Sequence, residues 1–230
     1  MPRQLYVHGY LNLDGQGISK SLGNVIEPQE LIDVYGVDPL RFWVARAVAF
    51  GQDADVTLES FHERYERELG NDLGNLLSRT TAMIARYRDG ELRKVGAEAG
   101  ELAAAASSLH ENVAAALDRF DITAALDAIW SYIRRLNRYV EQTKPWELAK
   151  DPALERELDR ALYELADGLR ISAIALAAYV PDTSERILEA LRQPVDLAWD
   201  KVAYGETLAV SGIAAAPPLF PRIDAPTTAA

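Results

Sequence analysis

The loop at residues 15–24 combines three glycines with the triplet Ser19, Lys20 and Ser21. Glycine lets a backbone bend and approach a ligand closely, lysine offers a mobile ammonium group, and serine adds hydroxyl and backbone donors. Such a loop can hold phosphates and stabilise the negative charge that develops when pyrophosphate leaves ATP. Because short motifs often occur by chance, a solvated turn with one lysine is the competing interpretation.

A second group of candidate residues lies on a helix that we expect over residues 62–88. At about 100° per residue, Asn75, Arg79 and Arg86 fall within one narrow stripe of that helix. The stripe points away from the leucines of the same segment, and residues 73–88 include no acid. Asparagine and arginine can read base edges through paired donors and acceptors, whereas a plain solvated helix face is the alternative interpretation.

A third group surrounds Trp146. Pro145 lacks a backbone N–H, so we expect it to end the preceding helix and to start a short new one with Trp146 in its first turn. The preceding helix carries three arginines on the face opposite its apolar stripe, namely Arg134, Arg135 and Arg138. A tryptophan at a helix junction beside several cations is suited to stacking on an unpaired base, although a tryptophan in a bundle is more often core.

Composition narrows the possible classes of protein. The 230 residues are 49% hydrophobic and 26% charged, the balance of a soluble globular protein. No apolar run approaches the ~20 residues that span a bilayer, and the first residues lack a signal-peptide core, so we expect a cytoplasmic protein with no membrane partner. The absence of cysteine excludes disulfides and thiolate metal sites. A net charge of −11 argues against a general nucleic-acid coat, so any RNA contact must come from a local basic patch.

The elements that position these residues form two regions. The first is a small mixed α/β region: we expect a strand over residues 5–13 closed by a turn at 14–15, short helices over 28–35 and 38–50, and a polar linker over 51–55. From Leu58 onward the pattern is almost entirely helical and predicts a bundle. Its expected helices cover 62–88, 101–118, 122 to near 145 with Asp121 as N-cap, and 154–180, and a capping box at 182–185 opens a fifth. The tail after Ala214 is expected to fray.

Residues 17–28 resemble the second signature of class I aminoacyl-tRNA synthetases, the KMSKS loop, and the match continues through residues 36–41. One departure is Gly17, because the family usually has lysine at the first position of the signature. The whole chain resembles the C-terminal portion of a methionyl-tRNA synthetase, through residues 8–11, 68–79, 144–150 and 219–224. The resemblance implies a mainly α fold, in which an anticodon-binding helical bundle follows a short α/β remnant of a class I, Rossmann-like catalytic domain.

The resemblance also assigns roles to residues. It implies that Ser19, Lys20 and Ser21 bind the ATP phosphates, with Lys20 catalytic, and that magnesium accompanies ATP while the chain itself has no metal site. It implies that three residues contact the CAU anticodon of tRNA(Met), with the tryptophan stacking on a base: Asn75, Arg79 and Trp146. The corresponding domains are residues 1–57, the catalytic remnant, 58–214, the anticodon-binding bundle, and 215–230, the tail.

Several family features are missing from the sequence: the His-Ile-Gly-His-type signature, the methionine pocket and the zinc-bearing insertion. We therefore expect an ATP-dependent methionine–tRNA ligase present as a truncated chain that is inactive alone, with a separate N-terminal half as one potential partner. The strand over residues 5–13 would then lack its sheet. The alternative hypothesis is a stand-alone anticodon-binding module without catalytic activity. A purely structural scaffold is a third, which leaves the matches at Asn75, Arg79 and Trp146 unexplained.

Overall fold

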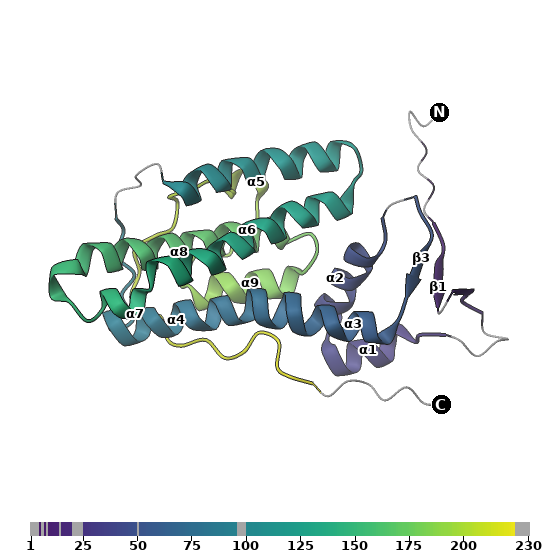
Figure 1. The fold of residues 1–230 in the computed structure, drawn as a ribbon, viewed down its shortest axis with the longest axis horizontal. Coiled ribbons are helices and arrows are strands. Elements are labelled where there is room, and N and C mark those ends of the chain that lie inside the picture. Colours follow the sequence, from purple (N-terminus) through teal and green to yellow (C-terminus); the bar gives the residue numbers. More distant parts are fainter. Residues whose placement is uncertain are drawn as a thin grey trace.

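The computed structural model describes residues 5, 7, 9–13, 15–19, 25–49, 51–95 and 100–223. The molecule is elongated and mostly helical, with a small sheet at one end of its long axis and the short helix α7 (Pro145–Leu148) at the other (Figure 1). Along the described ranges, no helix is both long and apolar enough to cross a lipid bilayer.

The sheet has three short strands in the order β2-β1-β3. Strand β1 (Leu11–Leu13) forms an antiparallel hairpin with β2 (Gln16–Gly17) and pairs in parallel with β3 (Ala54–Val56). Two prior expectations were wrong. Among the described residues, the strand expected over 5–13 is found only at Leu11–Leu13, where it has partners within this chain. The expected linker at 51–55 contains part of one of these partners, β3. A parallel pair needs a long crossover connection, which the two helices between β2 and β3 supply.

Those two helices are α1 (Pro28–Tyr35) and α2 (Val37–Ala47). Pro28 occupies the first helical position, where its missing N–H costs nothing. Gly36 separates the helices with a φ of 87°, in a region that glycine enters more easily than any other residue. The predicted break at this position is confirmed, although α2 ends at Ala47 rather than at residue 50.

A long helical rod follows the sheet. It consists of α3 (Leu58–Arg64), the π-helix η2 (Tyr65–Gly74) and α4 (Asn75–Arg88), which run on without a break (Figure 1). The sequence pattern predicted one regular α-helix here and gave no sign of the wider π turns. The C-terminal segment packs closely against this rod at Gly74, where a Cβ atom would lie 3.4 Å from the ring of Phe220.

The bundle continues with four more long helices: α5 (Glu101–Asp118), α6 (Ile122–Thr143), α8 (Glu155–Leu176) and α9 (Pro181–Ala190). Short 3₁₀ turns lie at Pro152–Leu154 and Trp199–Lys201. The predicted cap at the start of α6 is confirmed, since the Asp121 carboxylate accepts a 2.9 Å hydrogen bond from the N–H of Ala124.

The predicted capping box of α9 is wrong. The helix begins at Pro181, and no side chain of its own caps it. Instead, the carboxylate of Asp38 in α2 accepts a 2.6 Å hydrogen bond from the N–H of Thr183. Both residues are buried, so a side chain distant in sequence replaces the local capping residues.

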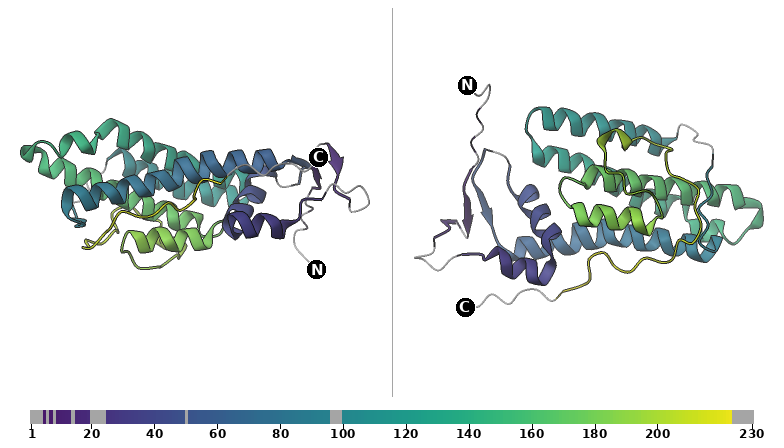
Figure 2. Two further views of the ribbon diagram at one scale, coloured as in Figure 1. Left: turned by 90° about the horizontal axis from the view of Figure 1, so that it is seen from below. Right: turned by 180° about the vertical axis from the view of Figure 1, so that it is seen from behind.

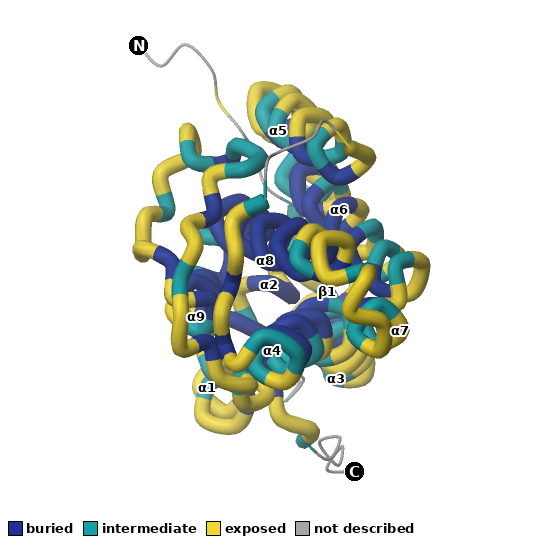
Figure 3. Tube along the Cα trace, turned by 90° about the vertical axis from the view of Figure 1, so that its left-hand side faces the viewer, coloured by how far each residue is buried: buried dark blue, intermediate teal, exposed yellow. Residues whose placement is uncertain are grey.

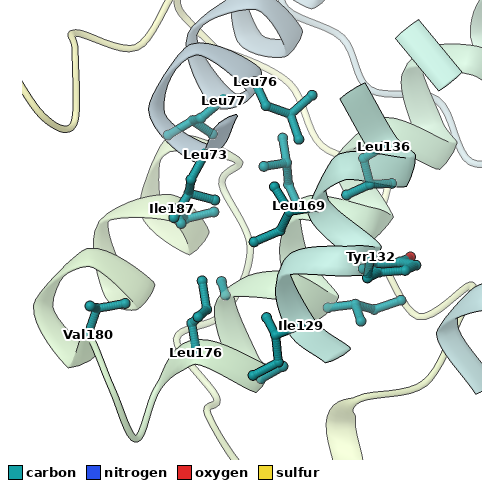
Figure 4. Close-up of a cluster of buried hydrophobic side chains, with 14 of the residues drawn as sticks. Leu73, Leu76, Leu77, Ile129, Tyr132, Leu136, Leu169, Leu176, Val180 and Ile187 are labelled. Atoms are coloured by element: carbon teal, nitrogen blue, oxygen red, sulfur yellow. The ribbon is translucent and has the colours of Figure 1, made fainter. Parts of the chain in front are cut away.

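The core is centred on α8, which is buried along most of its length (Figure 3). Figure 4 shows side chains from η2, α4, α6, α8 and α9 converging there, among them Leu73, Leu76, Ile129, Leu169 and Ile187. Trp43 and Trp130 are core residues, with exposures of 4% and 0%.

The C-terminal segment returns along the bundle and packs against it as far as Ile223 (Figure 2). Leu219 and Phe220 are buried, and the Tyr65 hydroxyl donates a 2.6 Å hydrogen bond to the carbonyl of Pro221. The tail after Ala214 is therefore not frayed up to Ile223, because buried apolar side chains and the hydroxyl of Tyr65 hold it. Residues 224–230 lie outside the described part.

A buried acid anchors the start of this returning segment. Asp167 in α8 is fully buried, and its Oδ1 accepts hydrogen bonds from the hydroxyl and the N–H of Thr207, at 2.7 and 3.1 Å. Its Oδ2 accepts a 2.6 Å bond from the N–H of Gly205. Arg170 supplies the compensating charge at 2.8 Å and donates onward to the carbonyls of Lys201 and Ala203. The Asp167–Arg170 ion pair thus holds residues 201–207, which follow α9, against α8.

Candidate functional site

The position of Trp146 is set by a turn at Lys144, whose backbone is in the left-handed region. Lys144 ends α6 with φ 46° and ψ 63°, and its N–H bonds to the carbonyl of Val140. Pro145 follows as the first residue of α7, where it cannot continue the hydrogen-bond ladder of α6. The carbonyl of Lys144 accepts from the N–H of Glu147 at 2.7 Å, which starts the new helix at once. The predicted junction is confirmed, and Trp146 lies half-buried at its outer corner.

Arg79 and Trp146 are in contact. The guanidinium carbon of Arg79 lies over the indole ring, 5.8 Å from its centroid, a cation–π arrangement. Glu141 in α6 holds the same guanidinium, whose Nη2 donates to Oε1 at 2.7 Å. The Arg79 side chain retains 33% exposure, so it remains open to a ligand. Three elements, α4, α6 and α7, thus build one charged aromatic platform.

Asn75 lies one helical turn before Arg79, on the same side of α4, and is exposed. It lines a groove of about 420 Å³ between the π-helix and the C-terminal segment. Its neighbours there include Asn71 and Ser78 on the helical rod and Phe220 and Arg222 on the segment. The groove therefore offers amide, hydroxyl and guanidinium groups beside the platform formed by Arg79 and Trp146.

This arrangement can bind a flat, hydrogen-bonding group. An indole face accepts a stacked aromatic ring, and the guanidinium beside it can donate two parallel hydrogen bonds. The Asn75 amide has both donor and acceptor atoms on the approach to the platform. An unpaired nucleobase has these features, with a π face and polar edges.

Of the other arginines near these residues, Arg88 and Arg135 are paired with acids, whereas Arg86 is exposed. Arg88 is structural, because it forms an ion pair with Asp159 and both side chains are largely buried. Arg135 pairs with Glu101 of α5 at 2.8 Å. Arg86 is exposed and lies over the ring of Tyr87, at 5.6 Å, rather than over Trp146. Of the predicted stripe, only Arg79 contacts the tryptophan in the described structure.

The described part of the glycine-rich loop, residues 15–19, is at the far end of the molecule. Gly17 is in β2, opposite Asn12, and Ser19 is half-buried just beyond that strand. Lys20 and Ser21, which were predicted to bind ATP phosphates with Ser19, lie outside the described residues. The sheet next to this loop and the α7 platform occupy opposite ends of the long axis (Figure 1). Within the described ranges, no three His, Asp or Glu side chains gather closely enough to hold a metal ion.

Sequence reasoning missed two parts of this site. Glu141 belongs to the segment around Trp146 but was not singled out, although it is an acid among several cations three residues from Arg138. Phe220 and Arg222 were noted only as part of a family match, and their packing against η2 had no local signal. Both omissions concern partners that are distant in sequence.

Comparisons with known proteins agree on one family. The family model for "tRNA synthetases class I (M)" matches residues 1–81. A methionine–tRNA ligase of Bacillus subtilis is 39% identical over 98% of this chain, and one of Clostridium tetani is 40% identical over 97%. The chain spans 35% of the length of each of these relatives.

Solved structures give the same result. The Mycobacterium tuberculosis methionyl-tRNA synthetase in complex with methionyl-adenylate superposes with a TM-score of 0.86 and 33% identity. The match covers 96% of this chain and 45% of that one. The apo form of the same enzyme superposes with a TM-score of 0.84 over 98% of this chain, at 30% identity. In sequence and in fold, the chain therefore belongs to the methionyl-tRNA synthetase family.

Proposed function

We propose that this chain is the part of a methionine–tRNA ligase that binds the CAU anticodon of tRNA(Met) and carries the phosphate-binding loop of the ATP site. Its anticodon-binding residues are Asn75, Arg79 and Trp146. The observation that carries the proposal is the contact between Arg79 and Trp146, with Asn75 one turn away beside a polar groove.

In this proposal, an anticodon base stacks on the exposed face of Trp146. Arg79, held by Glu141, donates hydrogen bonds to the edge of that base or to an adjacent phosphate. Asn75 pairs its amide with a neighbouring base edge at the groove. A half-buried indole next to a fixed guanidinium loses little side-chain freedom on binding, which favours recognition of a single base.

The proposed catalytic contribution of the chain is the loop of Ser19, Lys20 and Ser21. Lys20 would neutralise charge on the phosphates of ATP as methionine displaces pyrophosphate and methionyl-adenylate forms. Hydroxyl and backbone donors of Ser19 and Ser21 would hold the same oxygens. With Gly17 at the first signature position, the loop has one cation fewer than the usual family loop. Any magnesium ion that accompanies ATP is assigned no ligand in this chain.

The activity of the whole protein is the ATP-dependent joining of methionine to tRNA(Met), in the cytoplasm. It requires groups from the remaining length of a methionine–tRNA ligase, since the chain spans 35% of such a protein. Those groups would be supplied by an N-terminal half in the same protein or in a separate one. We propose the division into a catalytic remnant (1–57), an anticodon-binding bundle (58–214) and a tail (215–230). A stand-alone module is less favoured, because relatives matching 97–98% of the chain are ligases.

Binding of anticodon stem-loops tests the proposal directly. The 230-residue chain is titrated with a fluorescent CAU stem-loop and with an otherwise identical stem-loop whose first anticodon base is changed to U. We expect tighter binding of the CAU loop at low salt, with affinity falling steeply as salt rises. Equal affinity for the two loops, or no binding of either, would refute the assignment of the site.

A second assay tests the catalytic part. Methionine-dependent exchange of pyrophosphate into ATP reports formation of methionyl-adenylate. We expect no exchange by this chain alone, because catalysis of this kind depends on positioning both substrates. Exchange above background would show that the chain is catalytically sufficient.

A further inference from the structure

The three arginines of α6 have different surroundings. Arg135 faces α5 and is engaged with Glu101 at 2.8 Å. Arg134 and Arg138 are exposed, and neither forms an ion pair with any residue in the described part of the chain. In a protein with a net charge of −11, two unpaired arginines one helical turn apart need an explanation.

Their position relates them to the platform. Asn137 lies about 60° around α6 from Arg134, at 100° per residue, and donates a 2.8 Å hydrogen bond to the carbonyl of Asp72, which brings the Arg134 side of α6 towards the π-helix. Glu141, one turn further on, holds Arg79. Arg134 and Arg138 are separated by about 6 Å along the axis, at 1.5 Å per residue. They therefore form a line along α6 that leads to the Arg79–Trp146 contact.

Most acids on the facing helix are already engaged. Glu68 pairs with Arg46 and Arg64, and Glu63 pairs with Arg67. The remaining neighbour is Asp72, which is half-buried beside Arg134. Burial raises the pKa of Asp72, while Arg134 lowers it by a smaller amount. Asp72 thus offsets part of the charge of Arg134. Arg138 lies one helical turn further from Asp72, so its charge is offset less.

We propose that Arg134 and Arg138 form a phosphate track, contacting the backbone of the RNA strand that continues from the base stacked on Trp146. This inference rests on the proposed function. Arginine binds phosphate oxygens through a planar fork of donors, and phosphate contacts position a nucleic acid without reading its sequence. In a protein that otherwise repels RNA, such contacts supply much of the affinity and its dependence on salt.

The test separates charge contacts from base reading. The full 230-residue chain and its variants Arg134→Gln and Arg138→Gln are titrated with the CAU and UAU stem-loops over a series of potassium chloride concentrations. Each substitution should reduce the slope of log K against log salt by about 1. It should also weaken binding of both loops by the same factor, so that the CAU-to-UAU ratio is unchanged.

Arg135→Gln is the matched control, because it removes the same charge from the adjacent position but from the side that faces α5. It should leave the slope unchanged, and thermal unfolding of all three variants checks that they are folded. Unchanged slopes in both Arg134→Gln and Arg138→Gln would overturn the track. An altered CAU-to-UAU ratio would also overturn it, since that is the signature of a base contact. If the unmodified chain bound neither loop, the proposed function would fail first, and the track with it.

Discussion

The carboxylate of Asp38 in α2 caps the N-terminus of α9, through a 2.6 Å hydrogen bond to the backbone N–H of Thr183. The two residues are 145 positions apart, and both are buried. The contact joins a helix next to the small sheet to the last helix of the bundle. The stability of α9 therefore depends on a side chain from the N-terminal fifth of the chain.

Replacing Asp38 by alanine should lower the free energy of unfolding by about 1–2 kcal/mol, the usual cost of a lost helix cap. Urea denaturation followed by circular dichroism measures the change. Asp182→Asn is the control, because Asp182 is an exposed acid in the first turn of the same helix. A loss in the control as large as that in Asp38→Ala would contradict the role of the long-range cap.

Replacing Trp146 by alanine should weaken binding of a CAU stem-loop by about 1–3 kcal/mol, the typical contribution of one stacking side chain. Fluorescence anisotropy measures this difference. The matched control is Trp199→Ala, since Trp199 is partly exposed too but stacks on His110, with ring centroids 5.0 Å apart. Comparable losses in the two variants would exclude a specific platform at Trp146.

Replacing Asp167 by alanine should destabilise the protein by about 3–5 kcal/mol, because it leaves the buried Arg170 without its counter-charge. Asp167→Asn should cost less, since the amide keeps one acceptor for Gly205 or Thr207. Asp200→Ala, an exposed substitution in the same returning segment, should stay within about 0.5 kcal/mol of the parent. Chemical denaturation decides among these values, and a small effect of Asp167→Ala would show that the segment is held elsewhere.

Stability should also decrease at high pH through Tyr65. Burial raises the pKa of Tyr65 from its usual 10 to about 12. The folded state therefore keeps a proton that the unfolded state loses, so the stabilisation is complete below pH 10 and is lost as pH rises towards 12. Tyr65→Phe should lower stability at pH 8 by about 1 kcal/mol, the net value of the bond to Pro221.

The same variant should lose less stability than the parent between pH 10 and 12, although other buried tyrosines keep part of the dependence. Urea midpoints measured across this range test the prediction. Parallel curves for the two proteins would rule out Tyr65 as a contributor.

Local patterns predicted the helices well and their contacts poorly. Pro28, Pro145 and the Asp121 cap act within one or two turns, and their effects were visible in the sequence. The pairing of β1 with β3, the Asp38 cap and the packing of Phe220 join segments far apart in sequence, so no local pattern reports them. Arg79 and Trp146 were predicted individually, whereas Glu141, which fixes their relation, was recognised only through the fold.

The π-helix η2 directly precedes Asn75, the first residue of α4. Each residue of an α-helix turns the following side chains by about 100°, and each residue of a wider π-helix turns them by less, so the number of residues in η2 sets the direction in which the side chains of α4 point. Deleting one residue from Tyr65–Gly74 would keep the composition of α4 but rotate Arg79 away from Trp146. The length of η2 thus determines which residues of α4 face Trp146. An insertion or deletion in η2 would alter the site as severely as a substitution of Asn75 or Arg79.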